Sequence, residues 1–207
     1  DRLSVPAGTA PADAAAGMLS ALGIMLALYE RERSGLGQEV KTSLLMSLLA
    51  TMPYELSEFF ANGESGRRVG SGHYLNGMVY GGYRTKDGEI VMRGAPARVA
   101  EVLGNDEMAR DERFVAPQGA TRAELEPLRE EVRAGLQSVL SQMTTDEALD
   151  RLDAGGVWCM PVMDFEEITD HPQLAENEMV AAIDVPDGGS LRTLAAPMQL
   201  SRTPATG

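Results

Sequence analysis

The feature that most constrains this fold is an apolar run that follows Pro11-Ala12 and ends at Ser34-Gly35. Large apolar side chains recur in it every three or four residues, which is the period of an α-helix. This apolar stripe comprises Met18, Leu22, Met25, Leu26 and Tyr29. Arg31 and Arg33 in the last turn, with a glycine after them, are typical of a helix C-terminus. The sequence therefore predicts a helix that starts near Asp13 and carries one continuous apolar face.

A second helix is predicted to start after Ser43, whose hydroxyl is suited to an N-cap. Its buried side is predicted to consist of Leu45, Leu48, Leu49, Met52, Leu56 and Phe59. Pro53 lies inside this pattern and should kink the helix, because proline has no N–H to donate. Between the two helices, residues 38–42 are predicted to form a short strand.

Glycine becomes frequent from Asn62 to Gly82, which predicts a long loop of the kind that is often functional. The segment Tyr83–Met92 then has the pattern of a β-hairpin around Lys86-Asp87-Gly88. The remaining expected elements are helices near 96–103, 121–142 and 145–154, a strand at 158–162, a short helix at 165–169, and a hairpin of strands 180–185 and 191–194 across Asp187-Gly188-Gly189. This order is typical of an α+β middle piece between two parts of something larger.

The charge balance excludes some partners. The chain has 207 residues and a formal net charge of −13, without a basic run, so nucleic acid and anionic membranes are not expected partners. The longest apolar stretch, 17–29, is shorter than the roughly 18 residues of a membrane span. A single cysteine, Cys159, fits a reducing cytosol. We therefore expect a soluble, cytoplasmic protein.

Several kinds of active site are not supported by the motifs. The two histidines, His73 and His171, are far apart, and no metal-ligand spacing such as H-E-x-x-H or C-x-x-C occurs, so no metal is expected. Gly70-Ser71-Gly72 lacks the strand-then-helix context of a nucleotide loop, and the G-x-S-x-G elbow of a serine hydrolase is absent. What remains is Asp13, a carboxylate at a helix start. From composition alone an ordinary N-cap is the simpler interpretation of Asp13.

The segment from Ala12 to Leu45 resembles the active-site segment of the class III (CaiB/BaiF-type) CoA-transferases, in which an aspartate opens a small-residue helix. The matching positions in this segment are Asp13, Gly17, Ala21-Leu22-Gly23, Arg33, Gly35, Gly37-Gln38, Val40 and Ser43. Further matches follow in family order at Tyr83-Arg84-Thr85 with Asp87-Gly88, at Cys159-Met160-Pro161-Val162, at His171-Pro172-Gln173, and at Pro197 with Ser201-Arg202-Thr203-Pro204. The sequence departs from the family pattern at Lys41 and Tyr74.

The resemblance implies an α/β fold: part of a large nucleotide-fold domain plus a small α+β domain, with the family's N-terminal half outside this chain. On this mapping residues 1–75 form a large-domain segment with the active-site helix and linker. Residues 76–160 then form the small domain, and residues 161–207 return to the large domain. The resemblance also implies an interlocked homodimer.

The activity that the resemblance implies is transfer of CoA from an acyl-CoA donor to a carboxylic acid, with Asp13 as the catalytic carboxylate and a CoA thioester as substrate rather than a bound cofactor. Arg33, Arg67 and Arg68 are candidate contacts of the CoA phosphates, and Gly70, Gly72 and His73 are candidate binding residues in the glycine-rich loop. The loop is either a cover that excludes water or a solvated linker. Two alternatives stay open: an α-methylacyl-CoA racemase, whose histidine partner would precede Asp1, and a non-catalytic CoA-binding or scaffold module.

Overall fold

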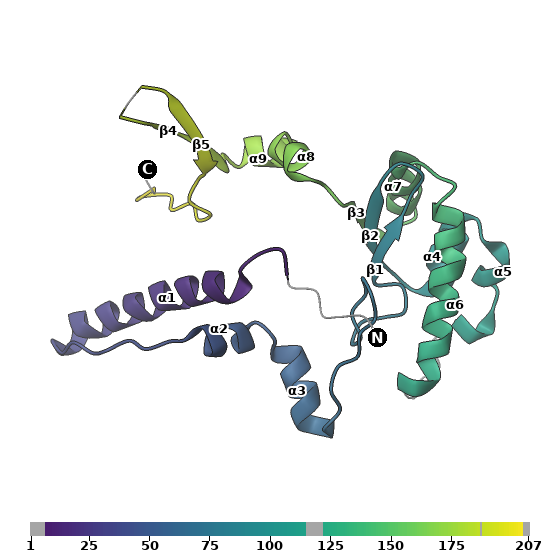
Figure 1. Cartoon of the computed structure of the whole chain (residues 1–207), viewed down its shortest axis with the longest axis horizontal. Coiled ribbons are helices and arrows are strands. Elements are labelled where there is room, and N and C mark those ends of the chain that lie inside the picture. The colour runs from purple at the N-terminus through teal and green to yellow at the C-terminus, as the bar shows by residue number, and fades with distance from the viewer. Residues whose placement is uncertain (1–6, 115–121, 187, 205–207) are drawn as a thin grey trace. The chain divides into compact units, whose positions relative to one another are not determined.

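The structure is a computed structural model that describes residues 7–114, 122–186 and 188–204 (Figure 1). The chain divides into two compact units, Asp1–Val69 and Gly70–Gly207. The boundaries at residues 75 and 160 that the sequence predicts stay predictions.

The first unit consists of the helices α1 (Pro11–Ser34), α2 (Leu44–Ala50) and α3 (Pro53–Asn62). α1 begins two residues before the predicted start, because Pro11 occupies its first turn, where a missing N–H costs nothing. Its C-terminus is as predicted: Gly35 takes the left-handed conformation, with φ of 76°, and its N–H donates to the carbonyl oxygen of Arg31 at 2.8 Å.

Two predictions for this unit are wrong. Residues 38–42 form no strand, since the described residues of the first unit, 7–69, contain no strand for them to pair with. Pro53 does not kink a helix but starts a new one, α3, again at a first-turn position. The predicted cap is confirmed: the hydroxyl of Ser43 accepts a hydrogen bond from the N–H of Met46 at 3.2 Å, at the start of α2.

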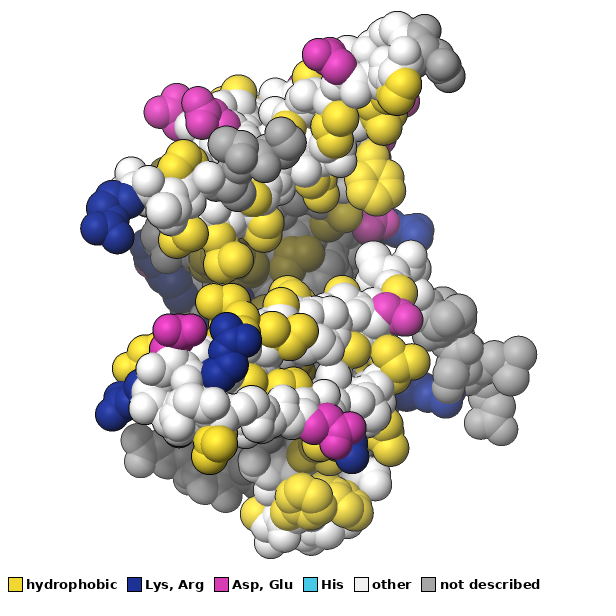
Figure 2. Space-filling model, turned by 90° about the vertical axis from the view of Figure 1, so that its left-hand side faces the viewer, with side chains coloured by type: hydrophobic (Ala, Val, Ile, Leu, Met, Phe, Trp, Pro, Cys, Tyr) yellow, Lys and Arg dark blue, Asp and Glu magenta, His cyan; other side chains and the backbone are white. Residues whose placement is uncertain are grey.

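The apolar side chains of this unit are largely exposed, which the sequence did not predict. Met18 and Met25 on α1 are 69% and 62% exposed, and Leu45 on α2 is 67% exposed. Among the predicted buried positions of α2 and α3, only Leu48 and Leu56 are half-buried. α1 packs on α2 and α2 on α3, and three helices alone cannot cover one another. Hydrophobic side chains are accordingly prominent at the surface in Figure 2.

α1 is also, by length and apolarity alone, able to cross a membrane, and it is the one such helix in the described part of the chain. A helix that is apolar around most of its circumference is either buried in a larger protein or embedded in lipid. The expectation from the sequence, that no stretch is long enough for a span, is therefore too strong.

The second unit contains a three-stranded antiparallel sheet in the order β1-β2-β3, formed by β1 (Gly81–Arg84), β2 (Glu89–Arg93) and β3 (Trp158–Pro161). Tyr83 pairs with Ile90, and Met92 pairs with Cys159, so these side chains share one face of the sheet. This confirms the predicted hairpin and the later strand.

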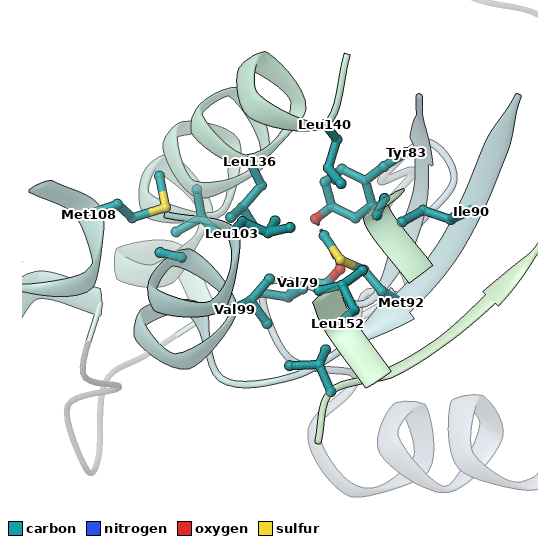
Figure 3. Packing of buried hydrophobic residues seen from close by; sticks show 14 of the residues in the cluster. Val79, Tyr83, Ile90, Met92, Val99, Leu103, Met108, Leu136, Leu140 and Leu152 are labelled. Carbon is teal, nitrogen blue, oxygen red and sulfur yellow. Dashed lines mark hydrogen bonds between the residues drawn. The ribbon is translucent and has the colours of Figure 1, made fainter. Parts of the chain in front are cut away.

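Helices cover that face of the sheet. They are α4 (Pro96–Leu103), α6 (Arg122–Leu140) and α7 (Thr145–Ala154). The short helix α5 (Asp106–Ala109) and the 3-10 turn Glu112–Phe114 lie between α4 and α6 in the sequence. Figure 3 shows Leu136, Leu140 and Leu152 pointing into the cluster that contains the sheet residues. The fully buried members are Val79, Ile90, Met92, Val99, Ala100, Val132, Leu136, Leu140, Ala148 and Leu152. The helix predicted at 121–142 thus contributes Val132, Leu136 and Leu140 to the core.

The chain continues from β3 through α8 (Phe165–Thr169) and α9 (Pro172–Glu176) to a hairpin of β4 (Val180–Asp184) and β5 (Ser190–Leu194). The hairpin was predicted, with Val180 pairing with Leu194. Asp187 of its predicted turn lies outside the described residues. The short elements α5 and α9 were not predicted. Each has a local cap instead of a periodic apolar face: Asn105 caps α5 and His171 caps α9.

Candidate active site

Asp13 lies in the first turn of α1, at the third helical position, and is exposed. It is therefore not the N-cap, the simpler interpretation of its sequence context. The N-cap is Ala10, which makes no side-chain cap hydrogen bond. The backbone N–H groups of a helix's first turn have no acceptor within the helix, and the helix dipole favours negative charge there. Asp13 is thus an exposed carboxylate in the first turn of a helix.

Arg33 lies at the opposite end of the same helix. Twenty residues separate it from Asp13, or about 30 Å at the helical rise of about 1.5 Å per residue. Its guanidinium donates to the hydroxyl of Tyr29 at 3.3 Å and lies over that ring at 5.8 Å from the centroid. Within this unit Arg33 therefore contacts its own helix, and the structure does not bring it to Asp13.

The other predicted binding residues lie where the two units join in sequence. Arg67 and Arg68 are exposed near the end of the first unit. Gly70, Gly72 and His73 open the second unit. Gly70 has φ of 69°, a left-handed conformation that glycine adopts without strain. These five residues lie close together along the chain.

His73 and Tyr74 form a stacked pair, with ring centroids 5.4 Å apart and planes inclined by 7°. The edge of Tyr80 meets the His73 ring at 6.4 Å. Nδ1 of His73 accepts a hydrogen bond from the backbone N–H of Leu75 at 3.2 Å. These contacts fix the orientation of His73 within the glycine-rich loop.

Two arginines of α6 contact the same loop, and the sequence analysis missed them. Nη2 of Arg133 donates to the hydroxyl of Ser71 at 2.6 Å and to the carbonyl oxygen of Gly82 at 2.7 Å. Arg129 donates to the carbonyl oxygens of Asn76 and Gly77 at 3.0 and 3.1 Å. The signal available in the sequence was their spacing of four residues, which places both on one face of the predicted helix.

The edge of β1 that faces α6 is also occupied by side chains. The amide of Gln137 accepts from the backbone N–H of Arg84 at 3.0 Å and donates to its carbonyl oxygen at 2.8 Å, as a neighbouring strand would. A cavity of about 270 Å³ lies there, lined by Ser71, Gly82, Tyr83, Arg84, Glu89, Arg133 and Gln137. The arginines that line it are already paired: Nε of Arg84 lies 3.4 Å from the carboxylate of Glu89.

Cys159 behaves as a core residue. Its thiol lies 4.0 Å from the carbonyl oxygen of Leu149, and burial, with the nearby charge of Asp153, raises its pKa. No group of three or more His, Cys, Asp or Glu side chains able to hold a metal occurs among the residues that the structure describes.

Comparison with known proteins identifies the chain's relatives. Residues 1–207 match the family model for CoA-transferase family III. The succinyl-CoA–D-citramalate CoA-transferase of Chloroflexus aurantiacus is 28% identical over 211 residues, covering 99% of this chain and 50% of the relative. The succinyl-CoA:mesaconate CoA-transferase of Haloarcula marismortui is 27% identical over 191 residues, covering 90% of this chain and 46% of the relative.

A solved CaiB/BaiF family protein from Brucella suis has the same fold, with a TM-score of 0.76 and 27% identity. That match covers 99% of this chain and 52% of the solved chain. The chain therefore spans about half the length of the relatives that it matches.

Proposed function

This chain belongs to CoA-transferase family III, and on that premise we propose that the full-length protein moves coenzyme A from an acyl-CoA to a carboxylic acid through a covalent intermediate on Asp13. The observation that carries the proposal is the position of Asp13: an exposed carboxylate in the first turn of a helix, inside a family match that runs through the whole chain.

The first half of the proposed reaction makes and resolves an anhydride. An oxygen of the Asp13 carboxylate attacks the thioester carbonyl, the C–S bond breaks, and CoA leaves as its thiolate. The thiolate then attacks the aspartyl carbonyl of the anhydride. This step releases the donor as a free carboxylate and leaves CoA as a thioester on Asp13.

The second half runs the same steps in reverse order with the acceptor. The acceptor carboxylate attacks the aspartyl thioester and expels the thiolate, and the thiolate attacks the acceptor's acyl carbon in the new anhydride. The products are the acceptor's CoA thioester and a regenerated Asp13 carboxylate. Backbone N–H groups in the first turn of α1 are suited to stabilise the oxyanions that form on the way.

Water must be kept from these intermediates, because hydrolysis of the anhydride or thioester wastes the donor. The glycine-rich segment from Gly70 to Gly82, with His73 and Tyr74 near its middle, is the proposed cover. Arg67 and Arg68, next to it in sequence, are the proposed contacts of the CoA phosphates. Arg33 has less support, because it contacts Tyr29 at the far end of α1.

For substrates we propose short dicarboxylic acids. The two relatives described above are named for succinyl-CoA with mesaconate or D-citramalate as partner acid, and all three acids carry two carboxylates. We further propose a cytoplasmic homodimer in which the apolar face of α1 is covered by protein rather than lipid. The exposure of that face within this chain is what such a cover would explain.

The test uses the purified full-length protein with succinyl-CoA and mesaconate, and measures CoA esters and free acids by liquid chromatography. Transfer predicts mesaconyl-CoA and succinate in equal amounts. Asp13→Asn, which keeps the shape and removes the nucleophile, should lower the rate by about a thousandfold or more. Full transfer by Asp13→Asn would contradict the proposal.

The racemase and the non-catalytic module give different results. A racemase would leave the CoA esters of that mixture unexchanged, and with an α-methylacyl-CoA in heavy water it would incorporate deuterium at the acyl α-carbon. A binding module would retain acyl-CoA without either reaction.

A further inference from the structure

The glycine-rich segment 70–82 has little structure of its own. Five of its thirteen residues are glycine, the residue that loses most conformational freedom on folding. Its internal backbone hydrogen bonds include Asn76 N–H to His73 and Tyr80 N–H to Gly77, both at 3.1 Å. A segment of this kind needs contacts from outside to hold one conformation.

Those contacts come from two places. At the C-terminal side, Val79 is fully buried, and the hydroxyl of Tyr83 donates to its carbonyl oxygen at 2.9 Å (Figure 3). At four further points, the guanidinium groups of Arg129 and Arg133 donate to the segment. Arg133 ties Ser71 to Gly82, the two ends of the segment, through one nitrogen.

The guanidinium of Arg133 is closely packed between the two ends of the segment. A Cβ placed on Gly81 would lie 3.0 Å from Nη1 of Arg133, 3.2 Å from Cα of Gly72 and 3.3 Å from the carbonyl oxygen of Ser71. The guanidinium also lies over the ring of Tyr83, 4.9 Å from its centroid. The ends of the segment are thus closed against each other, with Arg133 between α6 and the strand β1.

Arg129 holds the middle of the segment from the same helix face, four residues earlier. Its side chain is only 13% exposed, so its two hydrogen bonds to Asn76 and Gly77 lie in a partly desolvated place where charge-assisted bonds are strong. Gly72 to Leu75, which include the stacked His73 and Tyr74, are the residues left between the two points of attachment.

From this arrangement we infer that Arg129 and Arg133 are positioning residues that hold segment 70–82 in the shape that excludes water from the aspartyl intermediate. The inference rests on the proposed function, because the intermediate that water would hydrolyse belongs to that reaction. It assigns to α6, a helix without any predicted catalytic residue, control over the ratio of CoA transfer to wasteful hydrolysis. Loss of a guanidinium should leave Asp13 reactive but admit water to the acyl and CoA esters.

The test compares the full-length protein with Arg133→Met, Arg133→Lys and Ser71→Ala. The matched control is Arg98→Met, which removes a guanidinium that donates to the carbonyl oxygen of Gly155 at 2.8 Å, away from the segment. Hydrolysis of succinyl-CoA to free CoA and transfer to the acceptor are measured in the same reaction. We expect Arg133→Met to raise the ratio of hydrolysis to transfer about tenfold, equivalent to ~1.4 kcal/mol.

The graded variants separate positioning from general loss of stability. Ser71→Ala removes one of the two acceptors and Arg133→Lys keeps a donor, so both should give intermediate ratios, while Arg98→Met should give the wild-type ratio. An unchanged ratio in Arg133→Met, or an equal rise in Arg98→Met, would overturn the inference.

Hydrogen exchange gives a second readout that needs no activity. Backbone amides of 70–82 should exchange faster in Arg133→Met than in wild type or Arg98→Met, while those of β2 and α7 keep their protection. Unchanged hydrogen exchange in residues 70–82 would overturn the inference that Arg133 holds this segment, even in an active enzyme. A wild-type protein without CoA transfer would instead overturn the proposed function and, with it, the shielding role, whatever the exchange data show.

Discussion

The carboxylate of Asp87 accepts two hydrogen bonds from Thr145 through the same oxygen, from the backbone N–H at 2.7 Å and from the hydroxyl at 2.9 Å. Asp87 lies in the turn between β1 and β2, and Thr145 opens α7. The two residues are 58 positions apart in sequence. Their contact therefore ties the hairpin turn to the N-terminus of a helix that covers the sheet.

The first prediction concerns this tie. Asp87→Ala leaves the first N–H of α7 without its side-chain acceptor, so the midpoint of urea unfolding should fall. Asp150→Ala, at an exposed aspartate on α7, is the control and should leave the midpoint within error. Equal midpoints for wild type and Asp87→Ala would contradict the importance of the contact.

The second prediction is the pH dependence of the same contact. The hydrogen bonds from Thr145 lower the pKa of Asp87 below its ordinary 3.8 in the folded state. Its contribution to stability is thus fully present above that ordinary value and is lost as the pH falls through the lowered pKa. The stability difference between wild type and Asp87→Asn should be largest near neutral pH and shrink below about pH 3.8. A difference that grows on acidification would have the wrong sign.

The third prediction concerns Tyr83, whose hydroxyl donates to the carbonyl oxygen of Val79 inside the core. Tyr83→Phe removes the donor and leaves that buried carbonyl without it, which should cost about 1 kcal/mol of unfolding free energy. Tyr54→Phe, at a residue that is 78% exposed, is the matched control and should cost close to nothing. The two free energies are measured by urea denaturation. A Tyr83→Phe protein as stable as the wild type would contradict the assigned bond.

The fourth prediction concerns the apolar face of α1. Leu136 is fully buried in the second unit, so Leu136→Ala should cost about 2–5 kcal/mol. Leu22 on α1 is 55% exposed within this chain, yet the proposed cover implies that it is buried in the full-length protein. Leu22→Ala should then cost an amount of the same order in the full-length protein. A cost below about 0.5 kcal/mol, as at an ordinary surface position, would mean that protein does not cover this face.

The fifth prediction concerns Cys159. Because burial raises the pKa of its thiol, less thiolate is present at neutral pH than in the unfolded chain. Alkylation by iodoacetamide should therefore be slower in the folded protein than in urea. Equal rates in both states would contradict the raised pKa.

The second unit was largely predictable because its elements carry their signals locally. The helical spacing of Leu125, Leu128, Val132, Leu136 and Leu140 predicted α6, and Val132, Leu136 and Leu140 are fully buried. The turn residues Lys86-Asp87-Gly88 between two short strands predicted the hairpin. Short elements such as α9 depend on a single capping residue, His171, and give no periodic signal. In the first unit the helices were predictable, but the exposure of their apolar faces was not. Periodicity identifies the apolar side of a helix, but it does not show whether the same chain contains the residues that cover that side.

The candidate catalytic residue came from the sequence resemblance, whereas its structural surroundings came from the structure. Asp13 was predicted from the resemblance of its surroundings to a family's active-site segment, and its catalytic role stays a proposal. The structure places it inside the first turn of α1, which begins two residues earlier than predicted. Arg129 and Arg133 contact residues more than 50 positions away in sequence. Two arginines on one helix face look the same in the sequence whether they face solvent or a distant loop. Their contacts with segment 70–82 could therefore be found only from the structure.

The most direct test of the central claim is mass spectrometry of the full-length protein after reaction with succinyl-CoA. Covalent catalysis by Asp13 predicts a succinyl or CoA adduct on the peptide that contains Asp13. Hydroxylamine should convert it to a hydroxamate, and borohydride should reduce it to the alcohol. The adduct should be absent from Asp13→Ala. An enzyme that transfers CoA with an unmodified Asp13 peptide in rapidly quenched samples, or an adduct that persists in Asp13→Ala, would contradict it.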